Sequence, residues 1–220
     1  MSGANKKPPV CYIVGAGEDA GLDFARRECD YVIAADGGLA YLEAAGIRPD
    51  MAIGDFDSHA PPAEGPEGVK IERLPCEKDD TDTLAAVRRG LGLGFGVFLL
   101  YNCTGGRLEH TLANIQTLAH IANEGGRGFL VGPDFALALV RNGRISFGPG
   151  CGGYVSVFAH TDIAKGVNIG GLKYEMREGE LTSAFPIGVS NEFDGRPASV
   201  EVADGALAVV FPRRCLPKAV

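Results

Sequence analysis

Two aspartates, Asp55 and Asp57, stand one residue apart in the segment Gly54-Asp55-Phe56-Asp57-Ser58. The apolar residues 51–53 before them predict the end of a short strand, and the prolines that follow at 61 and 62 prevent a strand or a normal helix. Both carboxylates therefore belong to a tight turn at a strand end. Such a pair suits Mg²⁺, which takes hard oxygen ligands and keeps several waters. The alternative is a turn in which Asp and Ser side chains bond the local backbone.

A second acidic group opens a predicted helix at Lys78-Asp79-Asp80-Thr81-Asp82. Leu84, Val87 and Leu91 follow at helical spacing. Carboxylates near a helix N-terminus cap its N–H groups and favour its dipole, and one aspartate is enough for that role. Three aspartates beside a lysine, at a strand-to-helix corner, favour contact with a metal ion or a substrate.

A glycine-rich segment, Thr104-Gly105-Gly106-Arg107, precedes another predicted helix. Backbone N–H groups at the positive end of a helix dipole form a phosphate site, and Arg107 could add a forked donor. The alternative is a flexible connection with a solvated arginine. His110 and Asn114 are four residues apart and share one helix face, where they contact a nucleotide or only each other and the backbone.

Strands and helices alternate from residue 10 to residue 131, which predicts a parallel, Rossmann-like α/β sheet with right-handed crossovers. The predicted strands cover residues 10–14, 31–35, 51–54, 69–74, 96–101 and 129–131. The predicted helices run from Gly17 to about Arg27 and over residues 39–45, 82–91 and 108–122.

Ligands of such sheets bind beyond the carboxyl ends of the strands. Polar or glycine clusters stand where strands end or helices begin, at residues 15–17, 36–38, 54–58, 78–82 and 104–110. We expect several of these clusters to converge on one edge of the sheet.

The pattern changes after about residue 140, where glycines interrupt short strand-like runs. These runs cover residues 144–147, 154–159, 171–176, 199–202 and 207–211. Asp204-Gly205 between two alternating runs predicts a hairpin turn. The sequence therefore predicts an α/β domain over residues 1–138 and a small antiparallel β-sandwich over residues 139–220.

The composition is that of an ordinary protein of 220 residues with a net charge of −7. This charge disfavours a nucleic-acid groove or an anionic membrane surface, and no apolar stretch is long enough to span a membrane. Six scattered cysteines without a Cys-x-x-Cys motif disfavour a zinc site or a disulfide framework. They predict reduced thiols in a cytoplasmic protein.

The ordered set of motifs resembles the thiamine pyrophosphokinase family over roughly residues 10–212. The set consists of Asp36-Gly37-Gly38, the segments 54–58 and 78–82, Gly105-Gly106-Arg107-Leu108-Glu109-His110 with Asn114, and Gly188-Val189-Ser190-Asn191-Glu192. The resemblance implies an ATP-binding α/β catalytic domain followed by a β-sandwich that helps to bind thiamine. It also implies Mg²⁺-dependent transfer of the pyrophosphoryl group of ATP to the hydroxyl of thiamine, with release of AMP, by a homodimer whose sites lie at the subunit interface.

The same resemblance implies roles for individual residues. The implied acidic metal and phosphate cluster is Asp36, Asp55, Asp57, Asp79 and Asp82, of which Asp55, Asp57 and Asp79 would bind metal and Asp55, Asp57 and Asp82 would act in catalysis. The implied ATP contacts are Asp36, Lys78, Gly105, Gly106, Arg107, His110 and Asn114, and the implied thiamine contacts are Ser190, Asn191 and Glu192. The family usually has Asp where this chain has Glu109, which leaves a direct metal role for Glu109 open.

Three other functions remain open on the sequence. A phosphatase of the haloacid dehalogenase type would use Asp55 as nucleophile and Asp57 as acid, but it leaves the other motifs unexplained. A non-catalytic sensor would bind a nucleotide or thiamine without turnover. A pyrophosphokinase for another heterocyclic alcohol, such as a pterin, would use the same acidic set.

Overall fold

The computed structural model describes residues 7–56, 68–76 and 79–217. Asp57, Ser58 and Lys78, which belong to the acidic motifs, lie outside the described residues. The chain divides into two compact units, one ending at Thr117 and the other beginning at Leu118. The sequence-based domain boundary at residue 138 stays a prediction.

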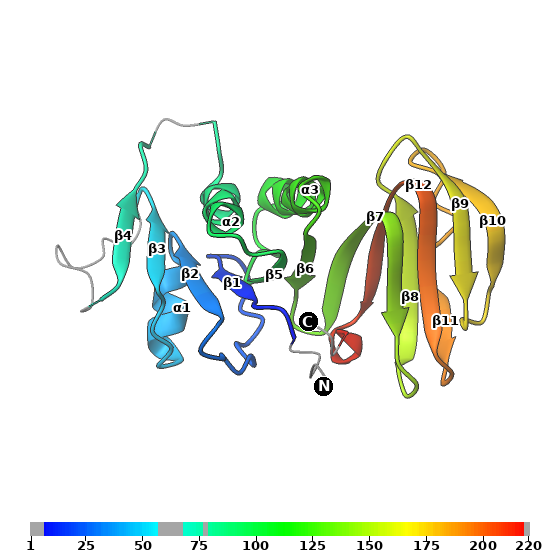
Figure 1. Cartoon of the computed structure of the whole chain (residues 1–220), viewed down its shortest axis with the longest axis horizontal. Helices are drawn as coiled ribbons and strands as arrows, with labels where there is room; N and C mark the ends of the chain where they lie inside the picture. The colour runs from blue at the N-terminus through cyan, green and yellow to red at the C-terminus, as the bar shows by residue number, and fades with distance from the viewer. Residues whose placement is uncertain (1–6, 57–67, 77–78, 218–220) are drawn as a thin grey trace, which may run out of the picture. The chain divides into compact units, whose positions relative to one another are not determined.

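The first unit contains a parallel sheet with the strand order β5-β1-β2-β3-β4 (Figure 1). Its strands are β1 (Cys11–Val14), β2 (Tyr31–Ala35), β3 (Met51–Gly54), β4 (Lys70–Arg73) and β5 (Val97–Tyr101). Every residue of β1, β3 and β5 is buried. These continuous buried runs are typical of a parallel sheet that is covered on both faces, and they confirm the parallel α/β prediction.

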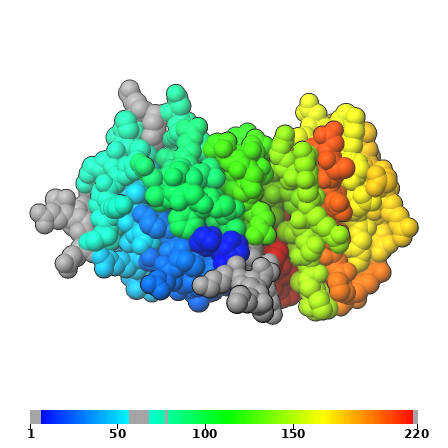
Figure 2. All heavy atoms as spheres, viewed as in Figure 1, coloured from blue at the N-terminus to red at the C-terminus, as the bar shows by residue number. Residues whose placement is uncertain are grey.

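Three helices accompany these strands in the described residues: α1 (Gly38–Ala44), α2 (Asp82–Gly92) and α3 (Leu108–Asn123). Along the chain, the strands run from β1 outward to β4, and α2 then leads back to β5, which pairs with β1 on its other side. Because the crossovers are right-handed, α1 and α2 cover opposite faces of the sheet (Figure 1). Thr81 caps α2, because its side chain accepts a hydrogen bond from Leu84 N at 3.2 Å. In the space-filling view α2 forms part of the outer surface of the unit (Figure 2). Within the described ranges, none of the helices has the length and apolarity needed to span a bilayer.

The segment between β1 and β2 contradicts the prediction of a helix ending near Arg27. Residues 15–30 form an irregular segment instead. The Phe24 ring stacks on Tyr12 with 4.1 Å between ring centroids, and the Tyr101 hydroxyl lies 3.1 Å from Asp23 Oδ1. Gly21 has a φ of +71°, which a helix does not allow. These contacts with distant residues outweigh a helical propensity that Gly21 already weakens by about 1 kcal/mol.

The second unit contains an antiparallel β-sandwich (Figure 1). The strands of this unit are β6 (Arg127–Val131), which pairs with the start of β7, and the sandwich strands β7 (Phe135–Phe147), β8 (Gly152–Ala159), β9 (Ile163–Gly170), β10 (Met176–Thr182), β11 (Asn191–Asp194) and β12 (Ala198–Pro212). The long β7–β12 ladder runs through the unit. The first half of β12 pairs with β9, and its second half pairs with β8, which in turn pairs with β11. The two halves of one long strand therefore join neighbours of different layers.

The prediction of a hairpin at Asp204-Gly205 is wrong, because β12 continues through it. The register against β7 shifts between Val202 and Ala206, as in a β-bulge. Gly205 has a φ of +107°, and its N–H donates to Asn142 Oδ1 at 2.9 Å. A side chain of another strand thus supplies the bond that a hairpin turn would have made locally. The predicted strand over 171–176 is also displaced, since β10 begins only at Met176, and β9 had no predicted counterpart.

Candidate active site

A cleft of about 920 Å³ lies in the first unit beyond the carboxyl ends of β1, β2, β3 and β5. Each of the predicted polar clusters contributes to its lining: Ala16, Gly17 and Glu18 after β1, Asp36 after β2, Asp55 after β3, Asp80, Thr81, Asp82 and Thr83 at the start of α2, and Thr104, Gly105, Gly106, Arg107, His110 and Asn114 after β5. The structure therefore confirms, for the described residues, that clusters far apart in sequence converge on one edge of the sheet.

The acidic side of the cleft arises where β2 and β3 end. Asp36 has a left-handed backbone with a φ of 47°, and its N–H donates to Ile53 O at 2.8 Å. A Cβ on Gly54 would lie 2.9 Å from the Asp36 Cα atom, so only glycine allows this approach. The two strand ends are thereby held together, which places Asp36 and Asp55 in the same lining.

The start of α2 contributes Asp80 and Asp82 to the lining. Asp79 is exposed and is not among the residues that line the cleft. Asp80, which the sequence groups with Asp79 and Asp82 but to which the resemblance assigns no individual role, does line it and forms an ion pair with Arg88. The local cause is the Thr81 cap, which fixes where the helix begins and hence which aspartates turn toward the sheet edge.

Carboxylate oxygens dominate this side of the cleft, and they are the ligand class that Mg²⁺ takes. Among the described residues, no group of three His, Cys, Asp or Glu side chains stands close enough to hold a metal ion. Mg²⁺ is usually bound through one or two carboxylates together with waters and substrate phosphates. Asp55 and Asp82 therefore fit part of such a site, and Asp57 lies outside the described residues.

The opposite side of the cleft is built by the start of α3. Gly105 and Gly106 both have left-handed backbones, with φ values of +77° and +62°, which turn the chain from β5 into the helix. Arg107 is exposed, and its Nε donates to Glu109 Oε1 at 2.6 Å. Glu109 accepts from its own backbone N–H and from Arg107, which together hold the pKa of its carboxyl below the usual value. Glu109 itself is not part of the cleft lining.

Asn114 has a structural task inside the cleft wall. It is buried, and its Nδ2 donates to Cys103 O at 2.8 Å. This bond ties α3 to the segment that follows β5. Cys103 is buried as well, and burial raises the pKa of its thiol to about 12, so the thiol stays protonated near neutral pH. Of the two motif residues on this helix face, His110 is the exposed one.

The floor of the cleft consists of the segments that follow β1 and β5, and backbone bonds hold them together. Gly15 N donates to Tyr101 O at 2.9 Å, Gly17 N to Asn102 O at 2.7 Å and Glu18 N to Thr104 O at 2.8 Å. Ala20 N donates to Asn102 Oδ1 at 2.8 Å. The sequence predicted no role for Asn102 or Glu18 and named Thr104 only as the first residue of the glycine-rich segment, because such cross-segment bonds leave no local sequence signal.

The residues that the resemblance assigns to thiamine lie in the second unit. Asn191 is buried and already engaged, because its Nδ2 donates to Tyr174 O at 2.7 Å and its Oδ1 accepts from Tyr174 N at 2.9 Å. Glu192 forms an ion pair with Lys173 at 3.0 Å. Ser190 has a φ of 58°, and its N–H donates to Ser156 Oγ at 3.1 Å. Asn191 thus fixes the backbone around Tyr174, whose own side chain is 62% exposed.

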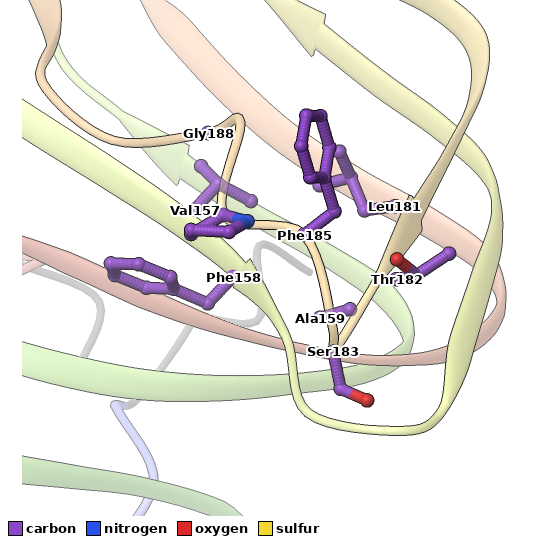
Figure 3. Close-up of a pocket in the computed structure, with 9 residues that line it drawn as sticks. Val157, Phe158, Ala159, Leu181, Thr182, Ser183, Phe185 and Gly188 are labelled. Atoms are coloured by element: carbon purple, nitrogen blue, oxygen red, sulfur yellow. The ribbon is translucent and has the colours of Figure 1, made fainter.

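The segment that leads into Ser190 packs on β8 and exposes apolar side chains. Gly188 O accepts from Val157 N at 2.8 Å, and a Cβ on Gly188 would lie 2.0 Å from Val157 O. Figure 3 shows the small cavity under this segment, to which Phe185 and Leu181 contribute. Its volume of about 30 Å³ holds about one water and no larger ligand.

Known proteins match both units of this chain. A family model described as "Thiamin pyrophosphokinase, catalytic domain" matches residues 24–129, and one described as "Thiamin pyrophosphokinase, vitamin B1 binding domain" matches residues 144–207. Thiamine pyrophosphokinase of Bacillus subtilis (strain 168) is 27% identical over 193 residues, which cover 81% of this chain and 85% of that protein.

Solved structures agree in fold. Thiamin pyrophosphokinase from Geobacillus thermodenitrificans has a TM-score of 0.80 and 25% identity, and the match covers 94% of this chain and 100% of that chain. Thiamin pyrophosphokinase from Candida albicans has a TM-score of 0.71 and 19% identity, with coverage of 92% and 90%. The two family models and the Bacillus subtilis relative favour pyrophosphoryl transfer to thiamine over a phosphatase or a pterin-type pyrophosphokinase. Because catalytic and vitamin B1-binding models match in order along most of the chain, the chain belongs to the thiamine pyrophosphokinase family.

Proposed function

We propose that this ATP-dependent diphosphotransferase moves the pyrophosphoryl group of ATP to thiamine in the cleft beyond β1, β2, β3 and β5. The observation that carries the proposal is the convergence of the predicted strand-end clusters on this one cleft. The cleft's volume of about 920 Å³ suits a nucleotide, since ligand sites of this kind measure about 300–1,000 Å³.

The phosphate chain of ATP would lie between the acidic side and the start of α3. Gly105 and Gly106 would present backbone N–H groups, and Arg107 would add a forked donor to phosphate oxygens. Arg107 is exposed, and within the described part of the chain its guanidinium pairs with the neighbouring Glu109, from which it can turn toward phosphate. We retain Lys78, Asp36 and His110 as further nucleotide contacts, and Asn114 as the residue that positions the segment after β5.

Asp55, Asp57 and Asp79 are the proposed metal ligands, with Mg²⁺ as the proposed ion. A bound divalent cation neutralises charge on the transferring phosphates and orients them. Asp82, which lines the cleft at the start of α2, would accept the proton of the thiamine hydroxyl as its oxygen attacks the β-phosphorus of ATP. The bond between that phosphorus and the bridging oxygen on the α side breaks, and AMP leaves.

Thiamine would be held with the help of Ser190, Asn191 and Glu192. Thiamine carries a positive thiazolium ring, which an acidic site attracts. We keep residue 138 as the proposed boundary between the catalytic and thiamine-binding domains, because it falls between the family matches that end at 129 and begin at 144. The cysteines are all free thiols, which supports the cytoplasm as the proposed location.

The reaction itself is tested by identifying both products. The protein is incubated with ATP, MgCl₂ and thiamine, and phosphorus NMR follows the nucleotide and the acceptor. We expect AMP and thiamine diphosphate to appear one for one. Coupled ADP would indicate an ordinary kinase, inorganic phosphate without an acceptor would indicate a phosphatase, and preference for a pterin alcohol would indicate the other pyrophosphokinase.

We also propose a homodimer whose sites are shared between subunits. Two inactive variants test this: Asp55→Asn, and a double variant with Ser190→Ala and Glu192→Ala. When they are unfolded and refolded together, half of the dimers are mixed, and about a quarter of all sites regain two intact halves if sites are shared. No recovery from two inactive but folded variants would refute the shared site. Sedimentation velocity on the wild-type protein measures the dimer independently.

A further inference from the structure

Two side chains in the floor of the cleft carry polar atoms that the fold does not use. Asn102 and Thr104 follow β5 directly, and both line the cleft. Neither Asn102 Nδ2 nor Thr104 Oγ1 has a hydrogen-bond partner within the described part of the chain, although both atoms are buried. Buried polar atoms are nearly always hydrogen-bonded in native proteins, so two exceptions in one cleft require an explanation.

The place of these residues in the fold is the one where α/β sheets bind ligands. The chain runs from β1 to β2 on one side, whereas β5 returns to the other side of β1. The carboxyl ends of β1 and β5 therefore flank the topological switch point of the sheet, where a crevice outside the strand ends receives the ligand. Asn102 and Thr104 belong to the segment after β5.

The orientation of the Asn102 amide is fixed by its neighbours. Ala20 N donates to Asn102 Oδ1 at 2.8 Å, which assigns the oxygen to that side. The remaining atom is the NH₂ group, which can only donate. Asn102 has a φ of 53°, a backbone conformation that glycine adopts more easily. Its side chain is nevertheless fully buried, and of its two polar atoms only the oxygen is hydrogen-bonded within the described residues.

Thr104 likewise has one polar group that is bonded and one that is not. Its carbonyl oxygen accepts from Glu18 N at 2.8 Å, while its hydroxyl is left without a partner in the described residues. Its side chain is 5% exposed. Gly105 and Gly106 follow it immediately and lead into α3, whose first N–H groups also lack helical partners. Donors from side chains and backbone thus gather within a few residues.

We propose that Asn102 and Thr104 bind the triphosphate of the nucleotide from the floor of the cleft, the amide and the hydroxyl each donating to a phosphate oxygen. This proposal rests on the function proposed above. A phosphate chain presents only acceptors on its oxygens, which matches an amide that can only donate. An adenine edge presents donors as well as acceptors, so it would match a pair of hydrogen-bond donors less well than a phosphate chain does.

The two atoms lie just beneath the cleft surface, so a phosphate reaches them only when the adjoining lining moves. Glu18 packs on Gly105, since a Cβ on Gly105 would lie 2.5 Å from Glu18 Cβ. An incoming phosphate repels the Glu18 carboxylate and favours its displacement. The glycines at 105 and 106, both with positive φ, provide backbone freedom at this point.

The test compares variants that change one donor at a time. Thr104→Val keeps the shape of the side chain and removes the hydroxyl, and Thr104→Ser restores the hydroxyl. Asn102→Asp keeps the oxygen that accepts from Ala20 N and replaces the NH₂ donor by an acceptor. Thr117→Val is the matched control, because Thr117 is a buried threonine of α3 outside the cleft lining.

Calorimetry measures the Kd of each protein for a non-hydrolysable ATP analogue and for adenosine. We expect Thr104→Val and Asn102→Asp each to weaken the analogue about tenfold or more, with adenosine unchanged, because a bond to a charged oxygen is lost. Thr104→Ser and Thr117→Val should bind the analogue as the wild type does. The KM for ATP should rise with the Kd, and the KM for thiamine should stay constant.

Two results would overturn the proposal. One is an unchanged analogue Kd for both donor variants, and the other is an equal loss for the analogue and for adenosine, which would assign the residues to the nucleoside or to the fold. Unfolding midpoints identify a variant that fails to fold. If Asn102→Asp fails to fold, the comparison of Thr104→Val with Thr104→Ser tests the proposal by itself. A wild-type protein that binds no ATP or releases no AMP would refute the proposed function instead, so the two failures are distinguishable.

Discussion

Replacing Gly17 by alanine probes how tightly the cleft floor is built. A Cβ at this position would lie 2.5 Å from Thr104 O and 2.8 Å from Asn102 O, whereas ordinary contacts begin at 3.4 Å. The segment after β1 must therefore move away from the segment after β5 by about 0.9 Å. Gly17 does not have a positive φ, so the close contact alone opposes the substitution.

This movement breaks or weakens the bonds that join the two segments. Gly17 N to Asn102 O at 2.7 Å and Glu18 N to Thr104 O at 2.8 Å would both exceed normal hydrogen-bond length. At about 0.5–1.5 kcal/mol for each bond, Gly17→Ala should lower the free energy of unfolding by about 1–3 kcal/mol. The corresponding fall in Tm is about 3–10 °C for a chain of this size.

Activity should suffer more than stability, because the displaced floor positions the nucleotide. A misplacement of about 1 Å can reduce turnover by up to about 100-fold, so we expect kcat/KM for ATP to fall about 10- to 100-fold. Far-UV circular dichroism during heating measures the Tm, and AMP release measures the activity.

Gly96→Ala is the matched control for this substitution. Gly96 is exposed, has no positive φ, and has no atom within 4 Å of an added Cβ. It should change the free energy of unfolding by less than about 0.5 kcal/mol. If Gly17→Ala behaved like Gly96→Ala in both Tm and kcat/KM, the close approach would not constrain the cleft, and the account of its floor would be wrong.

Substitutions at three further positions separate chemistry from stability. Asp55→Asn should lower turnover by a factor of about 100 or more while the Tm stays nearly constant, because the carboxylate serves the reaction; retained activity would remove Asp55 from the mechanism. Burial raises the pKa of Asp30, but hydrogen bonds from Arg27 and the backbone outweigh it and hold the pKa below its usual value. Its contribution is therefore present above about pH 4 and is lost as the pH falls through the folded pKa. Asp30→Asn should cost about 2 kcal/mol in urea unfolding at pH 7 and progressively less as the pH falls below about 4. If the Glu109 carboxylate contacts metal through water, Glu109→Asp should be tolerated and Glu109→Ala should reduce kcat/KM. Full activity of Glu109→Ala would show that Glu109 is a solvated side chain that only orients Arg107.

Much of the first unit follows from local sequence patterns. The apolar runs of β1, β2, β3 and β5 lie where the alternation of strand and helix predicted them. The parallel order follows from that alternation, because right-handed crossovers leave few topologies. The meeting of Asp36, Asp55 and Asp82 at one edge follows in turn, since the carboxyl ends of parallel strands share that edge.

The second unit was less predictable, because its strands depend on partners far away in the chain. Asp204-Gly205 has the local chemistry of a hairpin, yet Asn142 and Thr161 supply the bonds that keep β12 continuous through a bulge. The β9 strand contains two glycines, which weaken its strand propensity, and it is stabilised by pairing with β10 and β12. Tertiary pairing overrides local propensity in such strands.

The sequence by itself determined the acidic and glycine motifs, their order, and the sheet edge at which they meet. Only the tertiary structure decided that residues 15–30 are irregular, that Asp80 rather than Asp79 lines the cleft, and that Asn102 and Thr104 form its floor. The reason is that periodicity and capping act within a few residues along the chain, whereas the bonds from Gly17, Glu18 and Ala20 join segments about 80 residues apart. A local pattern carries no record of which distant carbonyl or side chain such a segment will meet.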